Sequence, residues 1–328
     1  MTRYDAKLAR IRSGNYKRSD FIIADAKDGD MGPSIRSCGP DLKKDGTFER
    51  YRTRPEFLAN VAKVVRQDIV DIMLVSASNL EALVDDGVFD ESSVKPAIRA
   101  NDTTDIWVGR GAGYSKKPSR PFRTASLKPT RRHTDLGLYS ITFNNDLDAD
   151  YESMVHFMDF VEDADENGFK YFLEVFNPNV DTGIAKEDVP FYVNDFICRS
   201  IAGLTKAQRP QFLKIPFNGA RALDELTSYD PSLVVGVLGG GAGTARDTFE
   251  LIFQAEKYGA RVALFGRKIN LAEDPLAMVK LMRAVADGDV SPEEAVKAYH
   301  GALQAQGQTP MRSLEDDLVT TETVLHYN

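Results

Sequence analysis

Strand-length apolar runs alternate with segments of helical periodicity along most of this 328-residue chain, and this alternation constrains its fold more than any other feature. Strands of a parallel sheet are buried on both faces and form apolar runs of about 4–8 residues, whereas an amphipathic helix repeats its apolar residues about every 3.6 positions. Phe57, Val61, Val64 and Val65 have the helical spacing in a segment that begins near Pro55. The alternation predicts repeated strand–helix units around a parallel sheet.

Eight strand–helix units fit the sequence, and they predict a single-domain α/β fold, the (β/α)8 TIM barrel. A doubly wound open sheet is the rival, but no G-x-G-x-x-G turn follows the first strand and the strand count exceeds the usual five or six. We expect the barrel to span residues 1–308, with an insertion at about 109–136 and a C-terminal tail at 309–328. The third strand is either 96–100 or 105–109, and the others are predicted at 21–26, 71–77, 138–143, 170–176, 211–217, 233–238 and 261–266.

The charge balance of the chain argues against polyanionic partners. With 41 basic and 49 acidic residues the net charge is −8, so the surface as a whole repels phosphate backbones and anionic membranes. Apolar runs such as 233–240 are far shorter than the roughly 20 residues of a membrane-spanning helix, and the N-terminus lacks the apolar core of a signal peptide. Cys38 and Cys198 form neither a metal-ligand spacing nor a disulfide framework. We expect a cytoplasmic protein without nucleic-acid or membrane partners.

Polar residues at the C-terminal ends of the predicted strands are the candidates for chemistry, because active sites of these barrels lie there. Asp25 and Lys27 end the first strand and, two positions apart, share one face; Glu174 lies on the fifth strand. Lys214 lies on the sixth strand with apolar neighbours on both faces, so its amine has little access to water and favours the neutral form that a Schiff-base nucleophile needs. A purely structural ion pair between Lys214 and Glu174 is an equally weighted alternative.

A glycine run after the seventh strand predicts a phosphate site. Consecutive glycines let backbone N–H groups approach an anion, the helix that begins near Thr244 adds its N-terminal dipole, and the loops after the seventh and eighth strands are the common phosphate site of such barrels. A tight turn that needs positive φ is the alternative interpretation. The candidate phosphate contacts are Gly239, Gly240, Gly241, Ala242, Gly266 and Arg267.

The segments FLEVF, FLKIPFNG, VVGVLGGGAG and ALFGRKINLAEDP together resemble the class I (Schiff-base) aldolases of the archaeal fructose-bisphosphate, tagatose-bisphosphate and sulfofructose-phosphate type, and more distantly deoxyribose-phosphate aldolase. The resemblance covers about 171–287. It implies that Lys214 forms the imine, that Glu174 transfers protons, and that phosphate is held by the loops after the seventh and eighth strands. Asp25 fits the family's first-strand acid, but no tyrosine acid stands at the end of the fourth strand, so the general acid is unassigned.

The resulting hypothesis is a metal-independent aldehyde-lyase with a phosphorylated metabolite as substrate. Asp25 and Glu174 would shuttle protons, and Lys27 would disfavour a charged Lys214 or bind a substrate oxygen. We expect no metal or other cofactor, because the four histidines are scattered along the chain. The alternatives are a phosphosugar isomerase or epimerase with a carboxylate base, and a catalytically silent barrel that binds a phosphometabolite. We also expect a homo-oligomer, since barrels of this type often self-associate.

One basic segment stands out from the acidic composition, because no acidic residue occurs between Ile106 and Thr134. Arg123 or Arg132 could reach the barrel mouth and bind a second anionic group. The favoured interpretation is a solvated flap or subunit-contact arm. The eight cations of the segment are Arg110, Lys116, Lys117, Arg120, Arg123, Lys128, Arg131 and Arg132.

Overall fold

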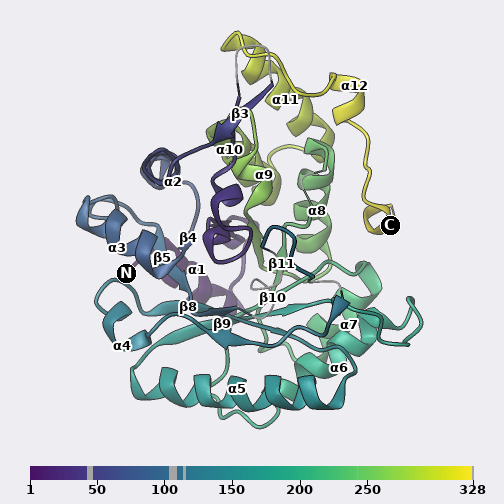
Figure 1. Cartoon of the computed structure of the whole chain (residues 1–328). Helices are drawn as coiled ribbons and strands as arrows, with labels where there is room; N and C mark the ends of the chain where they lie inside the picture. The colour runs from purple at the N-terminus through teal and green to yellow at the C-terminus, as the bar shows by residue number, and fades with distance from the viewer. Residues whose placement is uncertain (43–46, 103–108, 114–115, 242, 327–328) are drawn as a thin grey trace.

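Eight parallel strands form a closed barrel in the computed structural model, which describes the whole chain except 43–46, 103–108, 114–115, 242 and 327–328. Around the barrel the strands follow the order β1-β12-β11-β10-β9-β8-β5-β4 (Figure 1). The single-domain (β/α)8 prediction is therefore confirmed. The barrel strands are β1 Ile22–Ala26, β4 Ile72–Val75, β5 Lys95–Arg99, β8 Leu136–Thr142, β9 Lys170–Phe176, β10 Leu213–Ile215, β11 Val235–Leu238 and β12 Val262–Phe265.

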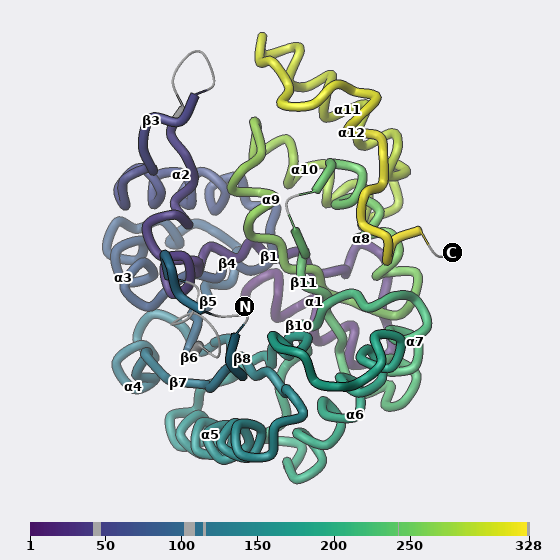
Figure 2. Tube along the Cα trace, turned by 45° about the vertical axis from the view of Figure 1, so that its right-hand side comes forward, coloured from purple at the N-terminus to yellow at the C-terminus, as the bar shows by residue number. Residues whose placement is uncertain are grey.

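Helices surround the barrel as the periodicity predicts, and Figure 2 shows them as a ring around the strands. Each has buried apolar residues along one side, and several begin at strong caps. In the first helix after β1, Thr53 and Glu56 form a capping box and Pro55 lies in the first turn. The long helices after the strands are α2 Arg54–Gln67, α3 Ala77–Asp85, α5 Leu147–Glu166, α6 Val189–Ile201, α7 Ala220–Tyr229, α8 Ala245–Lys257, α10 Pro275–Asp287 and α11 Pro292–Ala305.

The third strand is β5, which corresponds to the first of the two alternatives, 96–100. It pairs with β4 on one side and with β8 on the other, and so completes the barrel. The second alternative, 105–109, falls almost entirely outside the described residues. The chain after β5 forms the short strand β6 Asn101–Asp102, which pairs with β7 Phe122–Arg123, and then the short helix α4 Leu127–Thr130.

Two N-terminal features were not predicted. Helix α1, Arg3–Arg12, contributes Tyr4 and Leu8 to the cluster of apolar side chains that fills the barrel interior. The loop after β1 is rich in glycine and proline but contains regular structure. It contains the 3-10 turns η2 Gly29–Met31 and η3 Ser34–Cys38, followed by a hairpin of β2 Pro40–Leu42 and β3 Phe48–Tyr51.

The C-terminal segment lies along α8 and α11, as Figure 2 shows in yellow beside the green of α8. It contains α12 Leu314–Asp317 and the turn η6 Thr323–Leu325. Asp247 on α8 accepts hydrogen bonds from Thr321 N at 2.7 Å and Thr321 Oγ1 at 2.6 Å, while Leu325 is buried in the core. These contacts hold the segment that follows α11 against helix α8.

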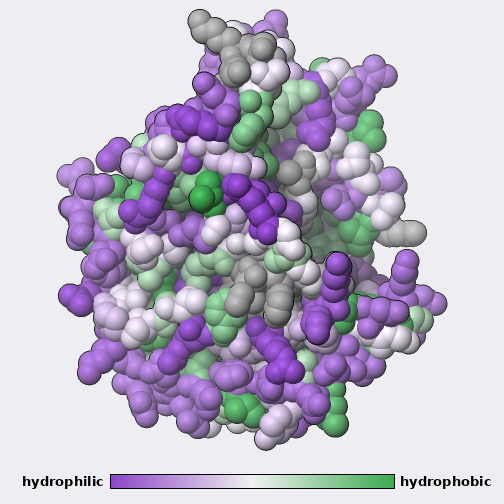
Figure 3. Space-filling view, in the orientation of Figure 1, coloured by the Kyte–Doolittle hydropathy of each residue, from purple (hydrophilic) through white to green (hydrophobic). Residues whose placement is uncertain are grey.

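Hydrophilic side chains cover most of the surface seen in Figure 3, with hydrophobic residues scattered among them. Among the described residues, no helix has the length and apolar character needed to cross a membrane.

Candidate active site

A cavity of about 380 Å³ opens where the barrel strands end. Its walls come from the C-terminal ends of β1, β5, β9, β10, β11 and β12, together with the loop after β1 and the short helix α9, Arg267–Asn270. This is the position at which (β/α)8 barrels carry their active sites. The charged residues that line it are Lys27, Asp28, Arg36, Arg99, Glu174, Lys214, Arg267 and Lys268.

Strand register brings Glu174 and Lys214 side by side in this cavity. Glu174 pairs with Lys214 across β9 and β10, and with Ser140 across β8 and β9. Each lies two positions after an inward-facing apolar residue, Phe172 and Phe212 respectively, so both side chains point into the barrel. The register therefore stacks Ser140, Glu174 and Lys214 in one layer above the apolar interior.

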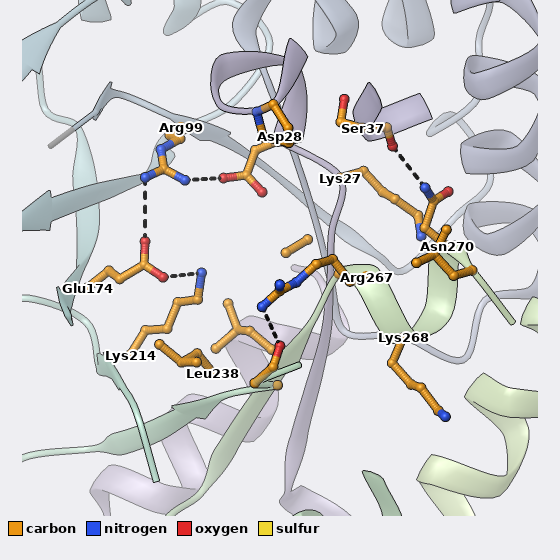
Figure 4. A pocket seen from close by; sticks show the side chains of 18 of the residues that line it. Lys27, Asp28, Ser37, Arg99, Glu174, Lys214, Leu238, Arg267, Lys268 and Asn270 are labelled. Carbon is orange, nitrogen blue, oxygen red and sulfur yellow. Dashed lines mark hydrogen bonds and ion pairs between the residues drawn. The ribbon is translucent and has the colours of Figure 1, made fainter. Parts of the chain in front are cut away.

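Lys214 and Glu174 form a buried ion pair. Lys214 Nζ lies 2.5 Å from Glu174 Oε1, and the two residues are only 6% and 1% exposed. A carboxylate at this distance can take a proton from the ammonium and return it, which is the exchange that an amine nucleophile needs. Figure 4 shows the pair in the wall of the cavity.

Arg99 extends this pair into a chain of charged groups on the other side of Glu174. Its guanidinium forms an ion pair with Asp28 at 2.9 Å, donates to Ser140 Oγ at 3.0 Å, and lies 3.8 Å from Glu174 Oε2. Ser140 Oγ in turn donates to Glu174 Oε2 at 3.0 Å. The described site therefore contains two carboxylates, held by one arginine and one lysine (Figure 4).

Asp25 and Lys27, which the sequence suggested as catalytic residues, make no contact with this chain of charged groups, although Lys27 lines the cavity. They do share one face, since Lys27 Nζ lies 3.1 Å from Asp25 Oδ1. The interior of the barrel, however, is filled from β1 by Ile22 and Ala24, so alternation turns Asp25 outward toward the helices. Asp25 is absent from the described lining of the cavity, and the Lys27 side chain extends toward Asn270, away from Lys214 (Figure 4).

Burial shifts both members of this outward pair toward their neutral forms. It raises the pKa of Asp25 from 3.8 to about 6, against the opposing effect of Lys27. Burial likewise lowers the pKa of Lys27, and the Asp25 carboxylate only partly offsets that effect. Apart from the Lys27 ion pair, no described group hydrogen-bonds to the carboxylate of Asp25. The pair is thus a buried charge cluster in which Lys27 lines the cavity and the Asp25 carboxylate does not.

Most of the predicted phosphate residues lie in the cavity wall at the ends of β11 and β12, beside the strand β10 that carries Lys214, whereas Gly241 is absent from the described lining. Gly239, Gly240, Gly266 and Arg267 line the cavity, and Arg267 donates to the carbonyl of Gly240 at 2.7 Å. Gly240 has a φ of +61°, which favours glycine, and a Cβ on Gly266 would lie 2.5 Å from the carbonyl oxygen of Ala26. The N–H groups of Gly240 and Gly241 have no hydrogen-bond partner among the described residues. Ala242 lies outside them.

The N-terminus of α8, expected to add its dipole to the phosphate site, is instead occupied by the chain itself. Thr244 caps the helix by accepting from Asp247 N, and Ala245 N donates to the buried carboxylate of Asp317 at 2.7 Å. Asp317 also contacts His300 Nε2 at 3.0 Å. The Asp317 carboxylate therefore occupies the position at the N-terminus of α8 where an external anion would otherwise bind.

The basic segment is turned partly toward α5. Arg120 pairs with Glu152, and Arg123 pairs with Asp163 at 2.6 Å. Neither Arg123 nor Arg132 lines the described part of the cavity, so the structure does not place either of them as a second anion contact there.

The described residues contain no group of three or more His, Cys, Asp or Glu side chains that could hold a metal ion. Cys38 and Cys198 are both free and half-buried.

Comparison with known proteins rests on structure alone, because no protein-family model and no curated protein matches the sequence. An archaeal fructose 1,6-bisphosphate aldolase superposes with a TM-score of 0.62 at 14% identity, covering 87% of this chain and 99% of that chain. The fold is similar to that of the archaeal aldolases. Another archaeal fructose-1,6-bisphosphate aldolase, with its catalytic Lys covalently bound to the carbinolamine intermediate of the substrate, gives 0.62 and 14% over 87% and 100% of the two chains. A protein of Corynebacterium glutamicum gives 0.60 and 15% over 87% and 94%.

Sequence reasoning missed three residues of this site: Asp28, Arg99 and Ser140. Ala24 and Ala26 of β1 point into the barrel, and Asp28 lies two positions further along the chain. The two-residue alternation of a strand could therefore have predicted that Asp28 faces the cavity. Arg99 ends a strand whose position was ambiguous in the sequence. Ser140 carries no charge and lies in a run that is buried throughout.

Proposed function

We propose that this chain is a class I aldolase-type lyase, an aldehyde-lyase that cleaves or forms a C–C bond in a phosphorylated sugar or related metabolite through an imine on Lys214. The observation that carries the proposal is the position of the Lys214 amine. It lies at the end of the sixth barrel strand, 2.5 Å from the Glu174 carboxylate, in the wall of the same cavity as Arg267. The similarity in fold to an archaeal aldolase solved with a carbinolamine on its catalytic Lys supports the same chemistry.

In the cleavage direction, the neutral amine of Lys214 attacks the substrate carbonyl carbon and forms a carbinolamine. Its hydroxyl takes up a proton and leaves as water, and the resulting protonated imine accepts the electron pair of the bond between the α and β carbons of the substrate. That bond breaks as an aldehyde departs, and the enamine left on Lys214 takes up a proton and is hydrolysed to the second product. Glu174 is the carboxylate nearest to Nζ and serves the proton transfers at the nitrogen and at the carbinolamine oxygen.

Asp28 takes the part that the sequence suggested for Asp25. It lines the cavity, and its carboxylate lies 2.9 Å from the Arg99 guanidinium. During cleavage a substrate hydroxyl must lose its proton as it becomes the aldehyde carbonyl, and a second carboxylate in the same cavity can accept that proton.

The phosphate of the substrate is assigned to the glycine-rich side of the cavity. Arg267 supplies a cation there, and the N–H group of Gly240, which has no hydrogen-bond partner among the described residues, supplies a backbone donor. Backbone donors together with a guanidinium form a good environment for a phosphate dianion. Cations outnumber acids in the cavity lining, which draws an anionic substrate to this face of an otherwise acidic protein.

The proposal is tested by trapping the imine. The protein is incubated with a panel of phosphorylated ketoses in the presence of borohydride, which reduces an imine to a stable secondary amine. We expect a covalent mass increase and irreversible inactivation with at least one ketose phosphate, and neither effect in the Lys214→Met variant. No adduct with any member of the panel would overturn the aldolase proposal.

A phosphosugar isomerase or epimerase is the second candidate, and the Lys214–Glu174 ion pair is the observation that favours it. Glu174 would remove a proton beside the substrate carbonyl while the Lys214 ammonium stabilised the enediolate. Ketose–aldose interconversion without a borohydride adduct would favour this reaction. A silent phosphometabolite-binding barrel would instead leave ligand-dependent thermal stabilisation and cellular function intact in Lys214→Met.

A further inference from the structure

Glu174 has two carboxylate oxygens, and they have different surroundings. Oε1 faces Lys214 Nζ at 2.5 Å. Oε2 faces the opposite side, where Ser140 Oγ donates to it at 3.0 Å and the Arg99 guanidinium lies 3.8 Å away. The carboxylate is 1% exposed, so these neighbours, rather than water, decide what each oxygen can do.

The direction of the hydrogen bond from Ser140 is fixed by Arg99. A guanidinium only donates, so Ser140 Oγ must accept from Arg99 Nη2, which lies 3.0 Å away. The single hydroxyl proton of Ser140 is then left for Glu174 Oε2. Because Oε2 accepts this proton and faces a cation, it is held as the unprotonated oxygen of the carboxylate.

Asn101 holds Ser140 in place for this role. The ladder between β5 and β8 is recorded for Ile98 with Gly137 and for Arg99 with Leu138. Beyond it, the Asn101 side chain accepts from Ser140 N at 2.6 Å and donates to Ser140 O at 2.8 Å. The buried amide therefore takes the place of a neighbouring strand and fixes the backbone of Ser140.

Arg99 itself is fixed from the same side. Its Nε donates to the carbonyl of Asn101 at 2.9 Å, and its Nη1 pairs with Asp28 at 2.9 Å. The guanidinium thus connects both carboxylates of the site while remaining 7% exposed. A lysine has one charged atom in place of this planar fork and could not hold Asp28 and Ser140 in the same geometry.

We propose that Arg99 and Ser140 are positioning residues that reserve Glu174 Oε1 for proton exchange with Lys214. This inference rests on the proposed imine chemistry, but it concerns a different property: which oxygen of one carboxylate carries the proton. Without the Ser140 donor, the carboxylate is free to rotate or to take its proton on Oε2, where Lys214 cannot reach it. Binding of the substrate phosphate at Arg267 is not affected.

The test compares Ser140→Ala with two matched variants. Ser140→Thr keeps the hydroxyl, and Ser153→Ala removes an equally buried serine hydroxyl that bonds only to the carbonyl of Ala149 in its own helix. We expect Ser140→Ala to lower kcat about 10- to 100-fold with little change in KM, since a hydrogen bond to a charged group is lost. The acidic limb of its kcat profile should move toward neutral pH. Ser140→Thr should recover most of kcat, and Ser153→Ala should behave as wild type.

A double-variant cycle shows whether Ser140 acts through Glu174. In a Glu174→Gln background, Ser140→Ala should lower kcat less than about twofold, because the carboxylate whose oxygens it distinguishes is gone. An equal loss in both backgrounds, or a wild-type kcat in the single Ser140→Ala variant, would overturn the positioning role.

Failure of this inference can be distinguished from failure of the aldolase proposal. If wild type forms no borohydride adduct, the proposed function fails. A crystal structure of Ser140→Ala without substrate then tests the positioning role by itself. We expect the Glu174 carboxylate to rotate away from Lys214 in this variant. A Glu174–Lys214 geometry unchanged from the 2.5 Å contact would contradict the inference.

Discussion

Replacing Asp25 and Lys27 together, as Asp25→Leu/Lys27→Met, removes the buried ion pair on the outward face of β1. Leu reproduces the branched shape of Asp, and Met follows the length of the Lys side chain. If the pair has no part in the reaction, the double variant should fold and keep a kcat/KM within about threefold of wild type. Exchange of a buried ion pair for apolar residues of similar shape is often neutral or stabilising.

The magnitude follows from the burial of Asp25. Its folded pKa of about 6 lies above the ordinary value of 3.8, a difference of about 3 kcal/mol at about 1.4 kcal/mol per pKa unit. Because the folded value is the higher one, the stability that this carboxyl contributes is fully present below about pH 4 and is lost as the pH rises through 6. The double variant escapes this loss, so its stability relative to wild type should improve between pH 4 and pH 7 by at most about 3 kcal/mol, because the lowered pKa of Lys27 contributes in the opposite direction.

Urea unfolding followed by circular dichroism at pH 4 and pH 7 measures this difference. The single variant Lys27→Met is the matched control, because it leaves Asp25 buried without its counterion and should lose about 3–5 kcal/mol at pH 7. A double variant that folds but loses more than about 100-fold in kcat/KM would return Asp25 and Lys27 to the active site and refute their outward assignment. A double variant less stable at pH 7 than Lys27→Met would refute the energetic argument.

Three further substitutions test the site and its support. Arg267→Ala should raise KM for a phosphorylated substrate about 10- to 100-fold through loss of a charged contact, and an equal rise for an analogue without phosphate would contradict this. Glu174→Gln should lower kcat about 100- to 10,000-fold, since it removes the carboxylate beside Lys214, and a loss under tenfold would contradict its role in proton transfer. Asp317→Ala leaves Ala245 N and His300 without their partner. It should lower the free energy of unfolding by about 1–3 kcal/mol at unchanged kcat, and an unchanged melting temperature would contradict this.

The barrel could be predicted because burial leaves a strong pattern in the sequence. Strands enclosed by helices are apolar on both faces, and the run at Lys170–Phe176 matches β9 from end to end. Because such a strand is apolar on both faces, its sequence does not show which side chains point into the barrel. In β1, Phe21, Ile22, Ile23 and Ala24 are all buried, so no alternation of polar and apolar residues says whether Asp25 points inward or outward.

The Arg99–Ser140–Glu174–Lys214 chain could be predicted only in part. Glu174 and Lys214 stand out because they are charges inside apolar strands. The contacts of Arg99 depend on the register of four strands and on Asn101, whose amide takes the place of a ladder partner for Ser140. No sequence spacing encodes that arrangement.

The carboxylate at the N-terminus of α8 is another contact that the sequence alone could not predict. The sequence at Thr244 predicts a helix start, and the structure has one. The carboxylate that accepts from the N–H of Ala245 there comes from Asp317, in the segment that the sequence predicted only as a C-terminal tail. Local pattern located the helix start, whereas the partner depends on the tertiary fold.

The most direct measurement is a peptide mass map of the protein after borohydride reduction in the presence of a reactive ketose phosphate. Lys27, Lys214 and Lys268 all line the cavity, so the map distinguishes among three candidate amines. The adduct should lie on the peptide that contains Lys214, and Glu174→Gln should form it more slowly. An adduct on Lys27 or Lys268 with Lys214 unmodified would contradict the assignment of the nucleophile.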